Sequence, residues 1–353
     1  MMSVQTLKLP RLHEALIVGG FSILVLFFLK ITNTAQADNS TSWFIYYFSF
    51  VANFPHFLVS YQLLYWDSKN QLFSHPRYLV ASVVAPGLLL GILFYGLFAP
   101  SREVLGQALN AMYFFVGWHY VKQTFGVISV CNSHEKIFFT SFERFAVKGF
   151  LYCIWALSWI SLNSFGAEYQ MEGILYRSLA LNPLYLKLAY SLLVGFGLLC
   201  AYTGYQRYIR EGNIISWSGF VAVFALLCWY LPTLYHPTFY LVVPLFHSLQ
   251  YLYFVYLVKT NEALDRHPSR QTPEDRKAFF KSYYGYLAWP FITGAVFMWF
   301  LPRYLDESGV LASQFERAAP FMFAFTVFIN IHHYFIDHAI WRHDNPKVKK
   351  YLF

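Results

Sequence analysis

Three histidines and an aspartate lie in an otherwise apolar stretch near the end of the chain, NIHHYFIDHAIWR, which runs from Asn330 to Arg342. Imidazole nitrogens bind iron, copper, zinc and nickel, and a nearby carboxylate can orient such ligands. Ionisable side chains inside a membrane helix are costly and face the interior of the bundle. The stretch therefore predicts a buried functional site, provided that other segments bring further ligands to it.

Three further histidines also lie within long apolar segments. Counted from the expected start of each segment, one histidine on each of four helices lies at a depth that agrees within about one helical turn. These four are His56, His119, His247 and His332. Histidines used only for packing would not be expected to share a depth. We therefore predict that the four bind one metal ion, with His333 and His338 as possible additional ligands.

Polar residues follow these histidines at helical spacing, because residues three and four positions apart lie on one face of a helix. They are Lys122 and Gln123 after His119, Gln250 and Tyr251 after His247, and Asp337 after His333. We predict that these side chains surround the metal or a substrate, with Asp337 orienting the His333 ring. The alternatives are that Lys122 extends to the membrane surface and that Tyr251 only packs.

The elements that must position these side chains are membrane helices. The chain has 353 residues, of which 57% are apolar and only 12% charged, whereas soluble domains average about 25% charged residues. About 20 apolar residues cross a bilayer, and about ten such stretches occur. They cover roughly 13–31, 43–66, 78–99, 105–131, 147–165, 183–205, 214–233, 237–258, 284–303 and 318–342. We predict an all-α, polytopic transmembrane bundle that forms a single domain over residues 1–353.

The basic residues concentrate in the loops on the side of both termini, which predicts that both termini are cytoplasmic. A charged segment at about 259–283 is expected to be a cytoplasmic loop that is partly helical, and a tight turn is expected at Leu234-Tyr235-His236. The first apolar run has no small-residue cleavage site after it, so we interpret it as an anchor. The expected location is the cell (inner) membrane, where the protein contacts lipid.

Charge and cysteine content exclude two other classes of site. The net charge of +8 comes from basic residues in short loops between apolar stretches, which is a topology signal rather than a nucleic-acid surface. The four cysteines lie in or beside apolar stretches without zinc-type spacing. We expect neither nucleic-acid binding nor a disulfide framework.

Four short patterns, in this order along the chain, resemble one known family. They are Phe54-Pro55-His56; Trp118-His119-Tyr120 with Phe125-Gly126; His247-Ser248 followed by Phe254-Val255; and His332 with Ile336-Asp337. Together they resemble the membrane-embedded β-carotene 15,15′-dioxygenases of the Brp/Blh type. The resemblance implies a helical membrane enzyme that holds non-haem Fe(II) by histidines and uses O2 to split β-carotene into two molecules of retinal. It gives iron-ligand roles to His56, His119 and His247.

The chain departs from the pattern of that family at three positions. Phe57 and Ser60 stand where the family has a glycine and an acidic residue, and Tyr251 stands where it has a second histidine. At the last of these positions, either Tyr251 ligates in a different way or His332 supplies the fourth ligand, and the depth of His332 favours the second alternative. The departures also admit a related oxygenase with another lipophilic substrate.

We therefore predict a membrane-embedded non-haem iron oxygenase that acts with O2 on a lipophilic substrate, a carotenoid or a lipid. The high aromatic content, 22% of residues, suits a tunnel for such a substrate or simple packing of the bundle. Two alternatives remain. Histidines on facing helices could instead hold a haem for electron transfer, and histidines with Lys122 and Asp337 could form the proton relay of a transporter.

Overall fold

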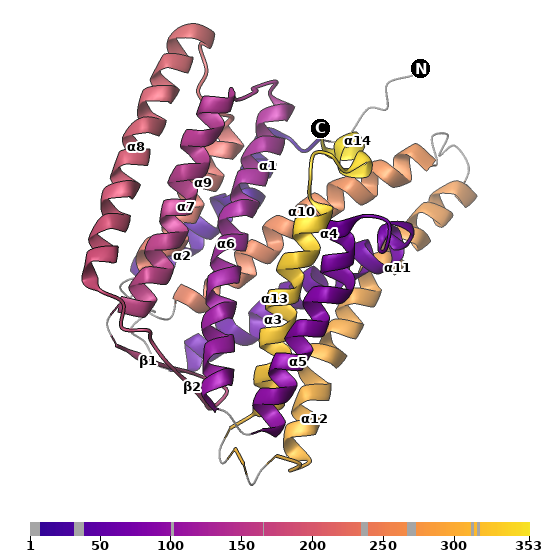
Figure 1. The fold of residues 1–353 in the computed structure, drawn as a ribbon. Coiled ribbons are helices and arrows are strands. Elements are labelled where there is room, and N and C mark those ends of the chain that lie inside the picture. Colours follow the sequence, from indigo (N-terminus) through magenta and orange to yellow (C-terminus); the bar gives the residue numbers. More distant parts are fainter. Residues whose placement is uncertain are drawn as a thin grey trace.

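The computed structural model describes residues 8–31, 39–99, 102–164, 166–233, 239–266, 273–311, 314–315 and 318–353. The chain folds into a helical bundle (Figure 1). Its first half contains α1 (Arg11–Ala15), η1 (Leu16–Gly20), α2 (Phe21–Ile31), α3 (Asn39–Gln62), η2 (Leu63–Asp67), η3 (Lys69–Gln71), α4 (Pro76–Leu79), η4 (Val80–Val84), α5 (Ala85–Phe98), α6 (Arg102–His134) and α7 (Ser141–Ser164). Its second half contains β1 (Glu168–Met171), β2 (Ile174–Arg177), α8 (Pro183–Glu211), α9 (Trp217–Thr233), α10 (Phe239–Arg266), α11 (Pro273–Ala295), η5 (Val296–Phe300), α12 (Leu301–Glu307), α13 (Pro320–Ile340) and α14 (Pro346–Leu352).

The predicted all-α class is confirmed, and a helix or a continuous run of helical segments coincides with each predicted span. The structure supports the predicted number of spans in part. Within the described residues, five helical stretches are long and apolar enough to cross a membrane, by length and composition. They are Arg11–Phe28, Pro76–Phe98, Ser141–Ser164, Pro183–Glu211 and Tyr284–Glu307. The remaining predicted spans fall short of these criteria: α3, α6, α10 and α13 carry many polar residues, and α9 has only a shorter apolar stretch.

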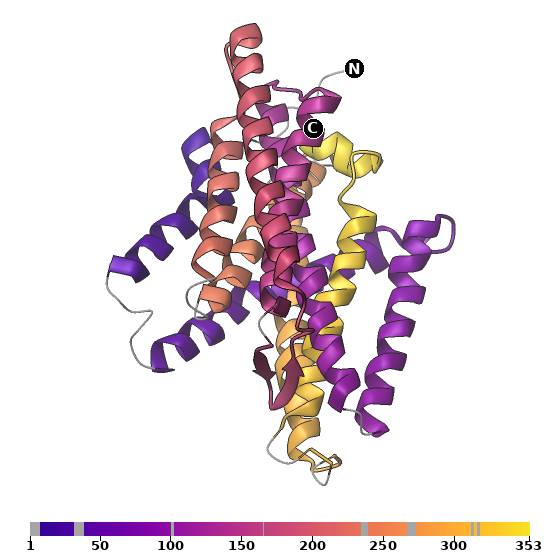
Figure 2. The ribbon, with the colours of Figure 1, turned by 60° about the vertical axis from the view of Figure 1, so that its left-hand side comes forward.

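The candidate spans and the polar helices differ in burial. Helices α3, α6, α10 and α13 pack against one another at the centre, with α3 contacting α10 and α13, and α6 contacting α13 (Figure 1). In contrast, α8 packs mainly against α7. Its Leu188, Leu198 and Ile209 side chains are exposed. Figure 1 shows α8 along one edge of the bundle, and Figure 2 shows the continuous helical segment from α4 to α5 along an edge of the turned view. An exposed apolar rim around a polar centre is the arrangement expected in lipid.

Local sequence signals account for where several helices begin and end. Thr140 and Glu143 form a capping box at the start of α7, in which the Glu143 N–H donates to Thr140 Oγ1 (3.2 Å) and the Thr140 N–H donates to Glu143 Oε2 (2.7 Å). At α8, the Asn182 side chain accepts from the Leu184 N–H (2.9 Å), and Pro183 occupies the first helical position. Gly212 ends α8 in the left-handed region, with φ of 70°.

A β-hairpin between α7 and α8 was not predicted. Strands β1 and β2 pair antiparallel through the turn residues Glu172 and Gly173, whose φ angles are 49° and 80°. Two residues with positive φ match the twist of a two-residue hairpin turn. Gly106 of α6 lies against this hairpin, and a Cβ there would come within 2.8 Å of the Leu175 carbonyl oxygen. The hairpin thus closes one end of the bundle beside the start of α6.

The opposite end of the bundle carries the first and last described helices. Val18 of η1 and Val348 of α14 share one buried apolar cluster, and α1 and α14 lie at the same end in Figure 1. The predicted loop at 259–283 is largely helical, because α10 continues to Arg266 and α11 begins at Pro273. Residues 267–272 and the predicted turn at Leu234-Tyr235-His236 lie outside the described residues.

Candidate metal centre

Four buried histidines meet at the centre of the bundle, one from each of α3, α6, α10 and α13. They are His56, His119, His247 and His333, and one ring nitrogen of each lies within 4.8 Å of the corresponding nitrogen of every other. All four are less than a tenth exposed. Metal–imidazole bonds of about 2.0–2.1 Å place neighbouring nitrogens about 3 to 3.4 Å apart. The 3.1 Å between His119 Nε2 and His247 Nε2 falls in this range, and the group could hold a metal ion.

The hydrogen bonds of His56 orient its free nitrogen toward the group. Ser248 Oγ donates to Asn53 Oδ1 (2.7 Å) and lies 2.7 Å from His56 Nδ1. Since the single hydroxyl proton goes to Asn53, His56 Nδ1 carries a proton and donates it to Ser248. His56 Nε2 therefore presents a lone pair, and it is buried without a hydrogen-bond partner among the described residues.

His333 is held in the same way by a serine from another helix. Ser60 Oγ donates to the Phe57 carbonyl oxygen (2.6 Å) and lies 2.8 Å from His333 Nδ1. The hydroxyl proton is again in use, so His333 Nδ1 donates and Nε2 presents a lone pair. A hydrogen bond to the far ring nitrogen is the usual way in which a protein sets the tautomer of a metal-binding histidine.

The other two histidines face each other directly. His119 Nε2 lies 3.1 Å from His247 Nε2, and the two rings are nearly perpendicular, with an interplanar angle of 80°. The Tyr120 ring lies 4.3 Å from the His247 ring, measured between centroids. Prolines occur inside both α3 and α10, at Pro55 and Pro244, just before the histidines that these helices contribute.

The structure does not bring His332 into this group, although its depth predicted it as the fourth ligand. His332 Nδ1 accepts from the Tyr61 hydroxyl (2.7 Å), and His332 Nε2 donates to the Ala81 carbonyl oxygen (2.7 Å). Both ring nitrogens are thus occupied by protein partners. His333, which the sequence offered as an additional ligand, takes the fourth place because consecutive residues on a helix point about 100° apart.

His338 and Lys122 lie outside the histidine group and contact each other. Lys122 Nζ lies 2.8 Å from His338 Nδ1 and above the rings of Trp118 and Tyr334, at 5.4 and 5.7 Å from their centroids. An ammonium group over aromatic faces is stabilised by their electron density. Neither contact involves a nitrogen of the histidine group. The roles of His338 as an additional ligand and of Lys122 beside the metal or a substrate stay predictions.

Gln123 and Gln250 connect helices rather than surround the metal. Gln123 Nε2 donates to Gln250 Oε1 (2.8 Å) and to the His247 carbonyl oxygen (3.1 Å), and Gln250 Nε2 donates to the Val18 carbonyl oxygen (2.5 Å). These bonds join α6, α10 and η1. The two glutamines hold the helix that carries His247 without touching its ring nitrogens.

Asp337 and Tyr251 lie next to the four histidines. Asp337 Oδ2 lies 3.2 Å from His333 Nε2 and 3.6 Å from His119 Nε2, while Asp337 Oδ1 accepts from the Tyr251 hydroxyl (3.0 Å). Asp337 therefore faces the nitrogen of His333 that points into the group. The predicted orienting role on the far side of the ring belongs instead to Ser60, which the sequence analysis singled out only as a departure from the family pattern.

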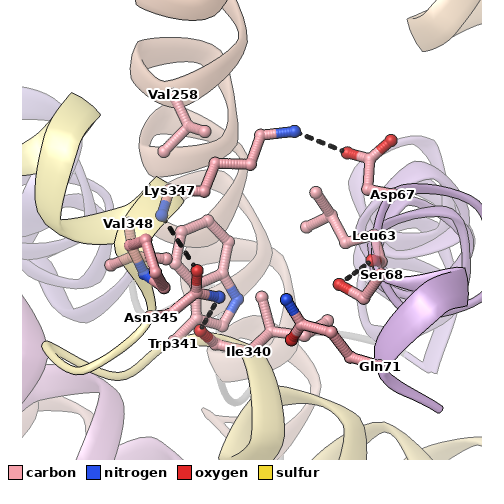
Figure 3. A pocket seen from close by; sticks show the side chains of 11 residues that line it. Leu63, Asp67, Ser68, Gln71, Val258, Ile340, Trp341, Asn345, Lys347 and Val348 are labelled. Atoms are coloured by element: carbon pink, nitrogen blue, oxygen red, sulfur yellow. Dashed lines mark hydrogen bonds and ion pairs between the residues drawn. The ribbon is translucent and has the colours of Figure 1, made fainter. Parts of the chain in front are cut away.

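A polar chain joins this site to a pocket at the end of α13. Trp341 Nε1 donates to the Tyr251 hydroxyl (3.0 Å), and Trp341 also lines a pocket of about 170 Å3 (Figure 3). Lys347 and Asp67 both line the pocket and form an ion pair (3.1 Å), and Lys347 also pairs with Glu262 (2.8 Å). None of the four histidines lines this pocket.

Aromatic rings cover the histidine group on the side of α6 and α13. The Tyr334 ring lies 6.3 Å from that of His119, 5.5 Å from Trp118 and 5.4 Å from Phe115, all between centroids. Trp118 also stacks on Trp155, with 5.6 Å between the ring centroids. These rings form an apolar wall beside the nitrogens.

The chain matches none of the known protein families, curated proteins or solved structures with which it was compared.

Proposed function

We propose that this protein is a membrane-embedded metalloenzyme that holds non-haem Fe(II) on His56, His119, His247 and His333 and oxidises a lipophilic substrate with O2. The observation that carries the proposal is the set of four ring nitrogens within 4.8 Å of one another in a buried site. The serine contacts of His56 and His333 add to it, because they leave a lone pair on each nitrogen that faces the group.

The donor set supports a bare metal ion over a haem. A haem between two of these histidines would have to occupy the space in which the other two imidazoles lie, since all four nitrogens meet within 4.8 Å. Imidazole ligands suit iron, copper, zinc and nickel. When bound, ferrous iron supplies the dioxygen activation that oxidative cleavage of a carbon–carbon double bond requires.

The residues around the nitrogens supply positioning and a dry environment. Ser60 and Ser248 hold two of the rings in one orientation, and the four histidines are shielded from water. The aromatic wall of Trp118, Tyr334 and Phe115 offers flat apolar faces to a polyene or a lipid chain. The resemblance to the Brp/Blh-type dioxygenases favours a carotenoid, and the chain's departures from that family's motifs leave a lipid as the alternative substrate.

A position in the membrane is supported by five apolar helices of sufficient length and by the exposed apolar side chains of the outer helices. About ten spans in the cell (inner) membrane, with both termini cytoplasmic, remain part of the proposal. The arrangement of α1 and α14 at one end of the bundle agrees with an even number of crossings.

Elemental analysis of anaerobically purified protein tests the metal, with His119→Ala and His332→Ala as a matched pair. Both are buried histidines on central helices, but only His119 belongs to the group. We expect stoichiometric iron in the wild type and in His332→Ala, and its loss in His119→Ala. Wild-type protein without stoichiometric metal, or equal loss from both variants, would contradict the proposed site.

The substrate is tested separately with the iron-loaded protein in lipid vesicles. β-Carotene and a mixture of unsaturated lipids are supplied with O2, and aldehyde products are separated by chromatography. Formation of retinal from β-carotene would support a carotenoid substrate. Formation of aldehydes from the lipids alone would show that the substrate is a lipid instead. Iron-loaded protein that consumes neither substrate would contradict the oxygenase function while leaving the metal site in place.

A further inference from the structure

One carboxylate oxygen of Asp337 lies close to two of the four ring nitrogens. Its Oδ2 lies 3.2 Å from His333 Nε2 and 3.6 Å from His119 Nε2, and the residue is only 6% exposed. The first distance falls in the range of about 3 to 3.4 Å expected between neighbouring donor atoms of one metal shell, and the second is slightly longer. Asp337 Oδ2 is thus close enough to the nitrogens of His333 and His119 to share a metal ion with them.

The contact with His333 does not have the geometry of a hydrogen bond. The two atoms are 3.2 Å apart, but His333 Nε2 has no hydrogen-bond partner among the described residues. The direction in which this nitrogen would form a hydrogen bond therefore does not point at Oδ2. The Ser60 contact also leaves a lone pair on that nitrogen. Two acceptors then lie 3.2 Å apart in a dry site, which is unfavourable unless a cation binds between them.

The second oxygen of Asp337 is anchored away from the histidines. The Tyr251 hydroxyl donates to Oδ1 at 3.0 Å, and Trp341 Nε1 donates in turn to that hydroxyl at 3.0 Å. This chain fixes the carboxylate so that Oδ2 alone faces the ring nitrogens. Tyr251 acts as a positioning residue for Asp337.

The charge of Asp337 has no permanent counter-charge nearby. Among the described residues, the ion-pair partners within 4.0 Å are His119 and His333, and no lysine or arginine lies at that distance. A buried carboxylate is costly unless it is paired or coordinates a metal. Conversely, a divalent ion on four neutral imidazoles carries its full charge, and one carboxylate ligand would halve that charge in a low-dielectric interior.

We propose that Asp337 Oδ2 is a fifth ligand of the metal, so that the centre has four imidazole nitrogens and one carboxylate oxygen. This inference rests on the proposed metal site. A five-donor set exceeds the four ligands of a structural zinc site and suits a metal that accepts five or six ligands, such as Fe(II). The carboxylate is also the hard, anionic donor that four histidines lack.

The test loads wild type, Asp337→Asn, Tyr251→Phe and His119→Ala with Co(II) alone and records visible absorption and affinity against a competing chelator. We expect weak absorption from the wild type, as for five- or six-coordinate Co(II). Asp337→Asn is expected to absorb several-fold more strongly, as for a four-coordinate ion, and to bind at least about tenfold more weakly. Tyr251→Phe keeps the carboxylate but frees Oδ1, so its spectrum should shift while the stoichiometry is retained.

The outcomes separate the fifth ligand from the metal site itself. Co(II) binding by Asp337→Asn with wild-type affinity and spectrum, while His119→Ala loses the metal, would overturn the ligand role of Asp337 and leave the four-histidine site standing. Failure of the wild type to bind Co(II) would overturn both. If Asp337→Asn does not fold, as judged by helical circular dichroism, an unchanged spectrum in Tyr251→Phe overturns the anchored arrangement.

Discussion

The central and peripheral helices of this bundle differ in the side chains that they bury. Helices α3, α6, α10 and α13 bury histidines, serines and Asp337 among apolar residues, whereas α8 and α5 expose rows of leucine and phenylalanine. Neither group alone would be stable in water or in lipid, because each leaves one class of side chain without a suitable environment. The apolar helices therefore form the outer surface of the bundle, and the polar helices hold the histidine group.

The largest effect is expected from replacing a phenylalanine by alanine, which we compare between the central and the peripheral helices. Phe323→Ala, at a fully buried position of α13, should lower the free energy of unfolding by about 3–5 kcal/mol because it leaves a cavity in the core. Phe94→Ala, at a position of α5 that is 64% exposed, should change it by no more than about 0.5 kcal/mol. Denaturant titration in detergent measures both. Equal losses would mean that the two regions are packed alike.

A charge placed on the outer surface tests whether that surface faces lipid. Leu198→Lys, on the exposed face of α8, should cost about 2.5–3.5 kcal/mol of insertion free energy and reduce the protein recovered in membranes. Phe73→Lys is the control, since Phe73 is more exposed still but lies between η3 and α4, outside the candidate spans. Wild-type recovery of both variants would contradict a lipid-facing α8.

Removal of one orienting hydroxyl should weaken the central site without disrupting the bundle. Ser60→Ala removes the acceptor for His333 Nδ1 and should weaken metal binding by about 10–100-fold, measured by chelator competition. Ser129→Ala removes a serine whose hydroxyl only bonds the Phe125 carbonyl oxygen within α6, and it should leave affinity unchanged. If the two variants bind equally well, the serine does not orient the ligand.

The smallest effect is expected at the ends of the helices, where ion pairs meet water. Arg77 donates to Asp344 at 2.7 Å, and this hydrogen bond holds the pKa of Asp344 below its ordinary value of 3.8. A lowered carboxyl pKa adds stability above pH 3.8 and loses it as the pH falls through the folded-state pKa. Because Asp344 is exposed, Asp344→Asn should cost no more than about 1 kcal/mol at pH 7.

Thermal unfolding measured at a series of pH values tests the pair of Arg77 and Asp344. The difference between wild type and Asp344→Asn in thermal unfolding should disappear in acid, and Glu307→Gln, which breaks a fully surface pair with Arg303, should show a smaller difference at pH 7. A difference that persists in acid would assign the effect to something other than the charge of Asp344.

Much of the helical framework was predictable from local patterns. Apolar runs located the helices, and the position of a histidine along each helix placed His56, His119 and His247 at one level. The spacing of four residues between His333 and Asp337 also put both on one face of α13. These features depend only on how residues are spaced along a helix, and that spacing can be read directly from the sequence. The hairpin of β1 and β2 was not predicted because its strands are only four residues long.

Other features depend on how the helices rotate about their own axes. Depth along the chain could not choose between His332 and His333, because one residue changes direction by about 100° while the rise is only about 1.5 Å. The sequence alone therefore determined the helices, the level of the histidines and the pairing of His333 with Asp337. The tertiary structure decided that His333 joins the group while His332 bonds Tyr61 and Ala81. It also paired Ser60 with His333 and Ser248 with His56, since contacts between helices follow from packing angles that no local pattern records.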